Sequence, residues 1–311
     1  MQKRSFTLQF LSLLLVCSAF LWACDPAQET AVTVPSPTDD LPTVTVSTNE
    51  PQVLPTPAAI EEPAPISVNG EAIPLTYYQH ELSRYRDSLA EEPVQPTEEE
   101  IAQKVQGYLF DQQLLSQAAR SNGFVVSDAQ LQERIDQLVK ELGSGGALTG
   151  WMQSNYYDDS EFRHTLRLAM EAAWQRDQIA QGVPDAVEQV RAQQIFARTQ
   201  AGADRALNSL NAGADFNTLA WDYSPESGGE LGWFPRGYLL YPEVEAAAFS
   251  LEPGSYSSVI QSQIGYHIIL VLEHESQHLL TTDARIALQN QALDAWLAQA
   301  RAAAEIVINL P

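Results

Sequence analysis

The sequence contains little cysteine and little positive charge. It has 2 cysteines in 311 residues, Cys17 and Cys24, and only 17 basic side chains against 40 acidic ones, which gives a formal net charge of −23. A chain this acidic is not suited to the phosphate backbone of nucleic acids, nor to docking on anionic lipid by charge. We therefore expect no nucleic-acid partner. Because cysteine is so scarce, we also expect a fold that depends on its apolar core and not on disulfides.

Motifs for nucleotide, hydrolase or metal chemistry are also missing. The segment "SPESGGELGWFPRG", residues 224–237, is rich in glycine, yet it has neither the Gly-Lys-Ser/Thr ending nor the spacing of a phosphate-binding loop. No Gly-x-Ser-x-Gly pattern occurs. His274 and His278, with Glu273 and Glu275 beside them, lack further ligands at metal-site spacing, and we interpret them as solvated linker residues. We expect no metal and no cofactor.

The N-terminus has the pattern of an export signal. Lys3 and Arg4 precede an apolar run over residues 6–20, long enough for a signal-peptide core and short for a membrane span. We predict a signal peptide over residues 1–23. The residues before Cys24, Leu-Trp-Ala, resemble the lipobox of bacterial lipoproteins, which implies a lipidated Cys24 that anchors the protein to the outer face of a bacterial membrane. The alternative is an ordinary secretory signal followed by a chance cysteine.

A proline-rich segment follows the predicted lipidation site. Residues 24–65 hold half of the 18 prolines, mixed with Thr, Val, Ser and acidic residues, and lack any amphipathic period. Such a composition cannot bury enough surface to offset its ordering entropy. We expect a disordered tether, with a glycosylated stalk as the alternative.

Residues 66–183 have the pattern of a hairpin followed by five helices. Asn69-Gly70 is the strongest two-residue hairpin signal. Capping boxes at Thr76/Gln79 and Thr97/Glu100 predict two helix starts, and Ser127 begins a third helix that ends at Gly143. Two further helices are expected over residues 148–156 and 160–180.

The pattern changes after Gly182 and Pro184. A strand is expected over residues 190–198, helices over 201–210, 215–223 and 243–249, and a strand over 265–273, with the glycine-rich loop 224–237 between the second and third helices. This order within about 85 residues is that of a compact α+β unit.

The order of five blocks, ending in "IGYHIILVLE", resembles a parvulin-type peptidyl-prolyl isomerase domain over residues 188–275. The hairpin "VNGEAI" and the helix and strand of residues 280–311 are similar to the chaperone module of SurA- and PrsA-like extracytoplasmic foldases. The resemblance implies an α+β protein in which a mostly helical module, residues 66–183 and 280–311, carries an inserted isomerase domain.

The same resemblance implies a site. His267 stands at the last-strand histidine of the family, and Glu226 stands near its acidic or thiol position. Gln194 occupies the place of the first-strand histidine, and Val244 replaces a phenylalanine. The implied prolyl pocket consists of four aromatic and two further apolar side chains: Trp233, Phe234, Leu239, Val244, Phe249 and Tyr266. Of these, Trp233 and Phe234 are also candidates for core anchors.

These departures leave two functions open. The resemblance implies a membrane-anchored isomerase and chaperone whose partners are unfolded or partly folded exported polypeptides with X-Pro bonds, with activity reduced by Gln194. Alternatively, Gln194 and His267 merely satisfy each other in the sheet, and the unit is a peptide-binding holdase. A solute-binding lipoprotein is a third class, but this chain lacks the repeated βαβ pattern that such binders usually need.

Overall fold

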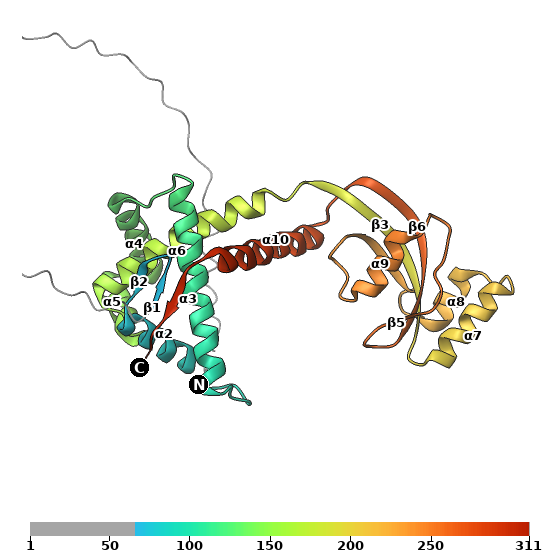
Figure 1. Cartoon of the computed structure of the whole chain (residues 1–311), viewed down its shortest axis with the longest axis horizontal. Helices are drawn as coiled ribbons and strands as arrows, with labels where there is room; N and C mark the ends of the chain where they lie inside the picture. Colours follow the sequence, from blue (N-terminus) through green and yellow to red (C-terminus); the bar gives the residue numbers. More distant parts are fainter. Residues whose placement is uncertain (1–65, 311) are drawn as a thin grey trace, which may run out of the picture. The chain divides into compact units, whose positions relative to one another are not determined.

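The computed structural model describes residues 66–310, so the predicted signal peptide, Cys24 and the proline-rich tether lie outside the described residues (Figure 1). The contacts of the described residues group them into two compact units. One holds residues 66–101 and 305–310, and the other holds residues 102–304. None of the helices in residues 66–310 combines the length and the apolar character needed to cross a bilayer.

The first unit contains a three-stranded antiparallel sheet of order β2-β1-β7, built from β1 (Ile66–Val68), β2 (Glu71–Ile73) and β7 (Ile306–Ile308). Asn69 and Gly70 both have positive φ, 52° and 79°, as the predicted hairpin turn requires. The first and last strands of the described chain pair with each other, with Ile66 opposite Ile308. Backbone and side chain of Asn69 also exchange hydrogen bonds with the backbone of Glu305.

Helix α2 (Leu75–Ser88) follows the hairpin and corrects one prediction. Its N-cap is Pro74, which offers no side-chain hydrogen bond. The capping box predicted at Thr76 is wrong, because Thr76 already lies inside the first helical turn and cannot stand outside it as a cap.

The other predicted caps are present. Helix α3 (Glu98–Ser121) follows a box in which the Thr97 N–H donates to Glu100 Oε2 at 2.7 Å and the Glu100 N–H donates to Thr97 Oγ1 at 3.3 Å. Helix α4 (Asp128–Leu142) has the same arrangement between Ser127 and Gln130, and it ends at Gly143, whose φ of 91° is left-handed.

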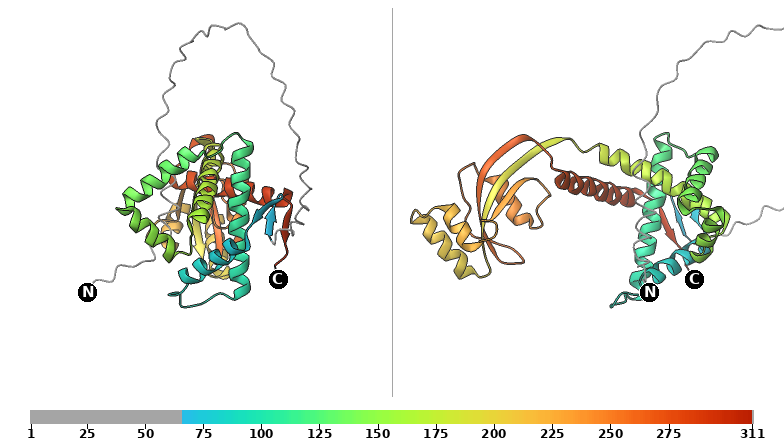
Figure 2. Two further views of the ribbon diagram at one scale, coloured as in Figure 1. Left: turned by 90° about the vertical axis from the view of Figure 1, so that its left-hand side faces the viewer. Right: turned by 180° about the vertical axis from the view of Figure 1, so that it is seen from behind.

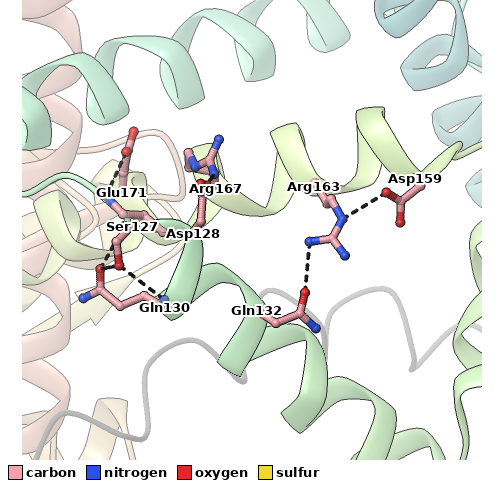
Figure 3. A network of polar contacts seen from close by, with 9 residues as sticks. Ser127, Asp128, Gln130, Gln132, Asp159, Arg163, Arg167 and Glu171 are labelled. Atoms are coloured by element: carbon pink, nitrogen blue, oxygen red, sulfur yellow. Dashed lines mark hydrogen bonds and ion pairs between the residues drawn. The ribbon is translucent and has the colours of Figure 1, made fainter.

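The helical part of the second unit also includes α5 (Gly145–Ser154), α6 (Asp159–Gln181) and α10 (Thr282–Ala303). Helices α4, α5 and α6 share an apolar core, whose buried members are Val126, Leu131, Ile135, Leu138, Leu148, Phe162 and Leu166. Polar contacts also link these helices, since Arg163 donates to Gln132 and Arg167 to Asp128 (Figure 3).

A four-stranded antiparallel sheet forms the rest of the second unit. Its order is β4-β3-β6-β5, from β3 (Ala186–Ala197), β4 (Glu230–Pro235), β5 (Ile260–Gln261) and β6 (Tyr266–Leu279). The long strands β3 and β6 run side by side in all views (Figures 1 and 2). Helices α7 (Gln200–Asn211) and α8 (Phe216–Tyr223) pack on Ile195 and Ile268, while α9 (Pro242–Ser250) packs on Val190, Ile269 and Val271. Because neighbouring residues of a strand face opposite ways, α9 and the α7–α8 pair cover opposite faces.

Two predicted boundaries are wrong in this sheet. The second half of the glycine-rich loop is strand β4, which pairs with Gln189–Gln193 of β3. Strand β6 continues to Leu279 because β3 offers it a partner as far back as Ala186. His274 and His278 therefore lie on β6 rather than in a linker, where they contact Glu188 and Glu275 respectively.

Candidate active site on the α9 face of the sheet

The structure brings three polar side chains together near one end of the four-stranded sheet. The Nδ1 atom of His267, on β6, lies 2.9 Å from Oε1 of Gln194, on the neighbouring strand β3. The Nε2 atom of the same ring lies 2.7 Å from Oγ of Ser262, in the turn between β5 and β6. We refer to Gln194, His267 and Ser262 as the polar triad.

The partners of His267 decide where its proton lies. The amide oxygen of Gln194 can only accept, so Nδ1 of the imidazole carries the hydrogen. Nε2 then has a free lone pair and accepts from the Ser262 hydroxyl. Ser262 Oγ in turn accepts from the Ile264 N–H at 3.3 Å. The chain of hydrogen bonds thus has one direction, from Ser262 through His267 to Gln194.

Burial keeps this imidazole neutral. Only 2% of His267 is exposed, and this burial lowers the pKa of the ring below its usual value, while the charge of Glu243 acts in the opposite, raising direction. Desolvation disfavours the charged form of a histidine, which agrees with the assigned tautomer. The arrangement is a neutral chain of hydrogen bonds in which the imidazole accepts from Ser262 and donates to Gln194.

The glycine-rich loop fits closely against the triad strand. Gly229 has a φ of 71°, and a Cβ at this position would lie 1.9 Å from the backbone oxygen of Gln194. The Gln194 N–H donates to the Gly229 oxygen at 2.8 Å. From the other side, buried Gln193 donates to the Gly228 oxygen at 2.7 Å. The glycines therefore permit the loop to approach the central strand β3 closely.

Apolar residues surround the triad on the same face. Phe196 pairs with His267 across the strands and its ring centroid lies 5.1 Å from the imidazole, while the Tyr241 ring lies 6.0 Å away. Val244 and Phe249 of α9 are buried, with 3% and 8% exposed, and pack with Phe234 in one cluster. Leu239 is half-buried against this cluster.

Three of the predicted site residues, Trp233, Tyr266 and Glu226, do not lie on the face of the sheet that carries the triad. Trp233 stacks on His278 at 4.0 Å, and strand alternation puts it on the opposite face from Phe234. Tyr266 precedes His267 on β6, so alternation turns it to the other face as well. Glu226 lies exposed in the turn after α8.

Phe234 is a core anchor. Its side chain is fully buried and its ring makes an edge contact with Phe249 at 5.9 Å. Of the two predictions for Phe234, pocket residue and core anchor, its burial fits the core anchor. Phe249 in turn lies beneath the Arg236 guanidinium, 4.1 Å from the ring centroid, and Arg236 pairs with Glu188.

Sequence reasoning missed Ser262, Phe196 and Tyr241. Two signals in the sequence point to them: Phe196 lies two residues from Gln194, hence on the same face of the strand, and Ser262 begins the turn that leads to Gly265 and β6. Tyr241 had no such local signal, because its position near His267 depends on the path of the β4–α9 loop.

Family comparisons agree with both parts of the fold. Residues 183–273 match the model of the PPIC-type PPIase domain, and residues 58–163 match the model of the SurA-like N-terminal domain. The first of these two segments contains the whole polar triad.

Individual relatives are distant. The foldase protein PrsA of Caldanaerobacter subterraneus is 26% identical over 240 residues, covering 65% of this chain and 71% of that protein. PrsA of Halalkalibacterium halodurans is 27% identical over 227 residues, covering 67% of this chain but only 59% of that protein, so this chain spans less than two thirds of its length. The crystal structure of PrsA from Bacillus cereus aligns with a TM-score of 0.44 at 23% identity, covering 66% of this chain and 85% of that one. The chain therefore carries a SurA-like N-terminal domain followed by a PPIC-type peptidyl-prolyl cis-trans isomerase domain, and it is a SurA/PrsA-like parvulin foldase by these similarities.

Proposed function

We propose that the protein is an extracytoplasmic, lipid-anchored isomerase and chaperone that assists the folding of exported proteins. In this proposal residues 188–275 form the isomerase domain, and residues 66–183 with 280–311 form the module that holds unfolded segments. The anchor is Cys24, which lies outside the described residues, and the tether of residues 24–65 holds the folded part away from the membrane. The observation that carries the catalytic part is the polar triad beside an apolar wall.

Prolyl isomerisation needs no covalent chemistry. The barrier of about 20 kcal/mol comes from amide resonance, so a catalyst must stabilise the twisted bond relative to the planar one. A twisted amide has lost resonance and is less polar at its oxygen, which an apolar surrounding tolerates better than water does. We assign the seat of the prolyl ring to the apolar residues on the triad face, Phe196, Leu239 and Tyr241, with Val244 and Phe249 supporting them from below.

Gln194 then supplies the polar contact. Its Oε1 is used by His267, whereas its Nε2 has no hydrogen bond to any of residues 66–310, so two N–H groups remain for the peptide. We propose that the side-chain amide of Gln194 donates a hydrogen bond to the substrate as the X-Pro bond twists. His267 and Ser262 hold the Gln194 amide in that orientation. The roles of Gln194, Glu226 and His267 as catalytic residues remain proposals in this scheme, and Glu226 has the weakest support because of its exposed turn.

One observation favours a second function. Gln194 stands where the family resemblance places a histidine. Its 2.9 Å contact with His267 also fits a purely structural pair, in which the two side chains only satisfy each other's hydrogen-bonding groups. In that case the domain binds peptide without catalysis and the protein is a holdase.

A refolding experiment separates these functions. The substrate is an unfolded protein whose slow refolding phase is limited by prolyl isomerisation, a step that takes tens of seconds at 25 °C. If the protein is an isomerase, catalytic amounts of the full chain shorten this slow phase, and His267→Ala abolishes the effect. If it is a holdase, only stoichiometric amounts act, and they reduce aggregation without shortening the slow phase. Failure of both effects would refute the proposal.

A further inference from the structure

The loop between β4 and α9, residues 236–241, forms one wall of the proposed prolyl seat. Tyr238, Leu239 and Tyr241 pack against the apolar cluster under α9, and Tyr241 approaches the His267 ring. Leu240, between two of these anchors, is 81% exposed. The conformation of this short loop therefore decides whether Leu239 and Tyr241 face the triad.

The carboxylate of Glu245 binds two backbone amides of this loop, which is also held where Gln291 donates to the Gly237 oxygen. Oε1 of Glu245 accepts from the Gly237 N–H at 2.6 Å, and Oε2 accepts from the Leu239 N–H at 3.0 Å. Both oxygens are used, one for each amide, and hydrogen bonds to a charged acceptor are roughly twice as strong as neutral ones. Gly237 has a φ of 80°, which lets the chain turn so that both N–H groups point to the same side chain.

Glu245 itself is fixed by a well-packed helix. It lies in the first part of α9, next to Val244, which is buried in the cluster along with Ala248 and Phe249 of the same helix. The N–H groups of Val244 and Glu245 both donate to the Tyr241 oxygen. The carboxylate therefore ties the loop, at two points, to an element that cannot move independently of the core.

We propose that Glu245 is a positioning residue, which preorganises the loop wall of the prolyl seat before peptide arrives. This inference rests on the proposed function of the same site. Without the carboxylate, the loop amides lose their partners, and binding a peptide must include the cost of ordering Leu239 and Tyr241. Preorganisation of this kind raises affinity by removing that cost.

The test compares Glu245→Ala and the isosteric Glu245→Gln with the parent, in the full chain. Binding and turnover of a short peptide of sequence Ala-Leu-Pro-Phe are measured by NMR, together with hydrogen exchange of the Gly237 and Leu239 amides. Glu252→Gln is the matched control, because it removes one exposed carboxylate just after α9. We expect Glu245→Ala to raise the peptide Kd and KM about tenfold with kcat changed less than about twofold, and to speed exchange of both amides. Glu245→Gln, which keeps one acceptor oxygen, falls between Glu245→Ala and the parent.

A second arm separates positioning from catalysis. Ser262→Ala lowers kcat and leaves the exchange of the two loop amides as in the parent. If Glu245→Ala releases the loop amides and the peptide Kd stays as in the parent, or if the amides remain protected, the positioning role is refuted. If the parent binds the peptide without accelerating its isomerisation, the isomerase proposal fails, and the binding and exchange measurements still decide the role of Glu245.

Discussion

At the scale of single residues, His267 is expected to make the isomerase activity depend on pH. Burial lowers the pKa of the imidazole below its ordinary value of about 6.5. The neutral ring accepts from the Ser262 hydroxyl, and protonation would turn Nε2 into a donor and reverse the direction of that hydrogen bond. We therefore expect kcat/KM to stay constant from about pH 8 to 6.5 and to fall at lower pH, with an apparent pKa below 6.5.

The free energy of unfolding is expected to fall with pH in the same direction as the activity. Because the folded pKa of His267 is depressed, the unfolded chain binds the proton more readily, and the stability contributed above about pH 6.5 is lost as the pH falls through the folded pKa. NMR titration of the ring measures this value directly. Glu243→Gln is the sign control, since removing a charge that raises the pKa should lower it further. A ring that titrates at or above 6.5 would contradict the assigned burial and tautomer.

A second prediction at this scale concerns Gly229. A methyl group at this position meets the Gln194 backbone oxygen at 1.9 Å, and the φ of 71° is already unfavourable for other residues. We expect Gly229→Ala to destabilise the domain by about 3 kcal/mol or more, measured by urea unfolding. Gly213→Ala is the matched control, because Gly213 also has a positive φ, 94°, but open space around it. Equal losses in the two variants would show that the close approach to Gln194 is unimportant.

At the scale of elements, Glu171 connects α6 with the segments around it. This buried carboxylate accepts from the Ser116 hydroxyl on α3 at 2.5 Å and from the Val126 N–H just before α4 at 3.2 Å. It is 2% exposed, and Ser116 and Val126 are buried as well, so these two partners have no access to water if the carboxylate is removed.

We therefore expect Glu171→Leu to destabilise the helical part by about 3 kcal/mol, read from urea unfolding followed by circular dichroism. Glu171→Gln keeps an acceptor and should cost less. Combining Glu171→Leu with Ser116→Ala should recover part of the loss, because one orphaned hydroxyl is then gone. A Glu171→Leu protein as stable as the parent would contradict this assignment.

Local signals predicted most helices and one hairpin correctly. Asn69-Gly70 and the capping pairs at Thr97 and Ser127 act within a few residues, and the structure contains each of them. Strand β4 was missed because residues 224–237 contain four glycines, and its strand conformation depends on pairing with β3, some 40 residues earlier in the chain. The predicted cap at Thr76 failed because the helix already begins at Leu75, directly after Pro74.

The site was predicted in part for the same reason. Gln194 and His267 came from a resemblance of ordered blocks, and in the structure they are hydrogen-bonded to each other. Their catalytic roles stay predictions. Ser262 and Tyr241 reach the same ring from a turn and a loop, whose paths depend on tertiary packing. No period in the sequence encodes that packing.

At the scale of the whole molecule, the chain combines two matched domains in an order typical of SurA/PrsA-like foldases. The last strand β7 pairs with the first strand β1, so the chain returns to its described beginning after the isomerase domain. Both the isomerase and the holdase proposals use this architecture, and they differ only in whether the polar triad accelerates bond rotation.

The isomerase proposal is tested most directly by cis/trans exchange of a short X-Pro peptide, measured by NMR with the parent chain, Gln194→His and His267→Ala. We expect accelerated exchange with the parent, loss of the acceleration in His267→Ala and retained acceleration in Gln194→His. A folded parent that leaves the exchange rate unchanged, with acceleration gained only in Gln194→His, would contradict it and leave the pocket as a binding site.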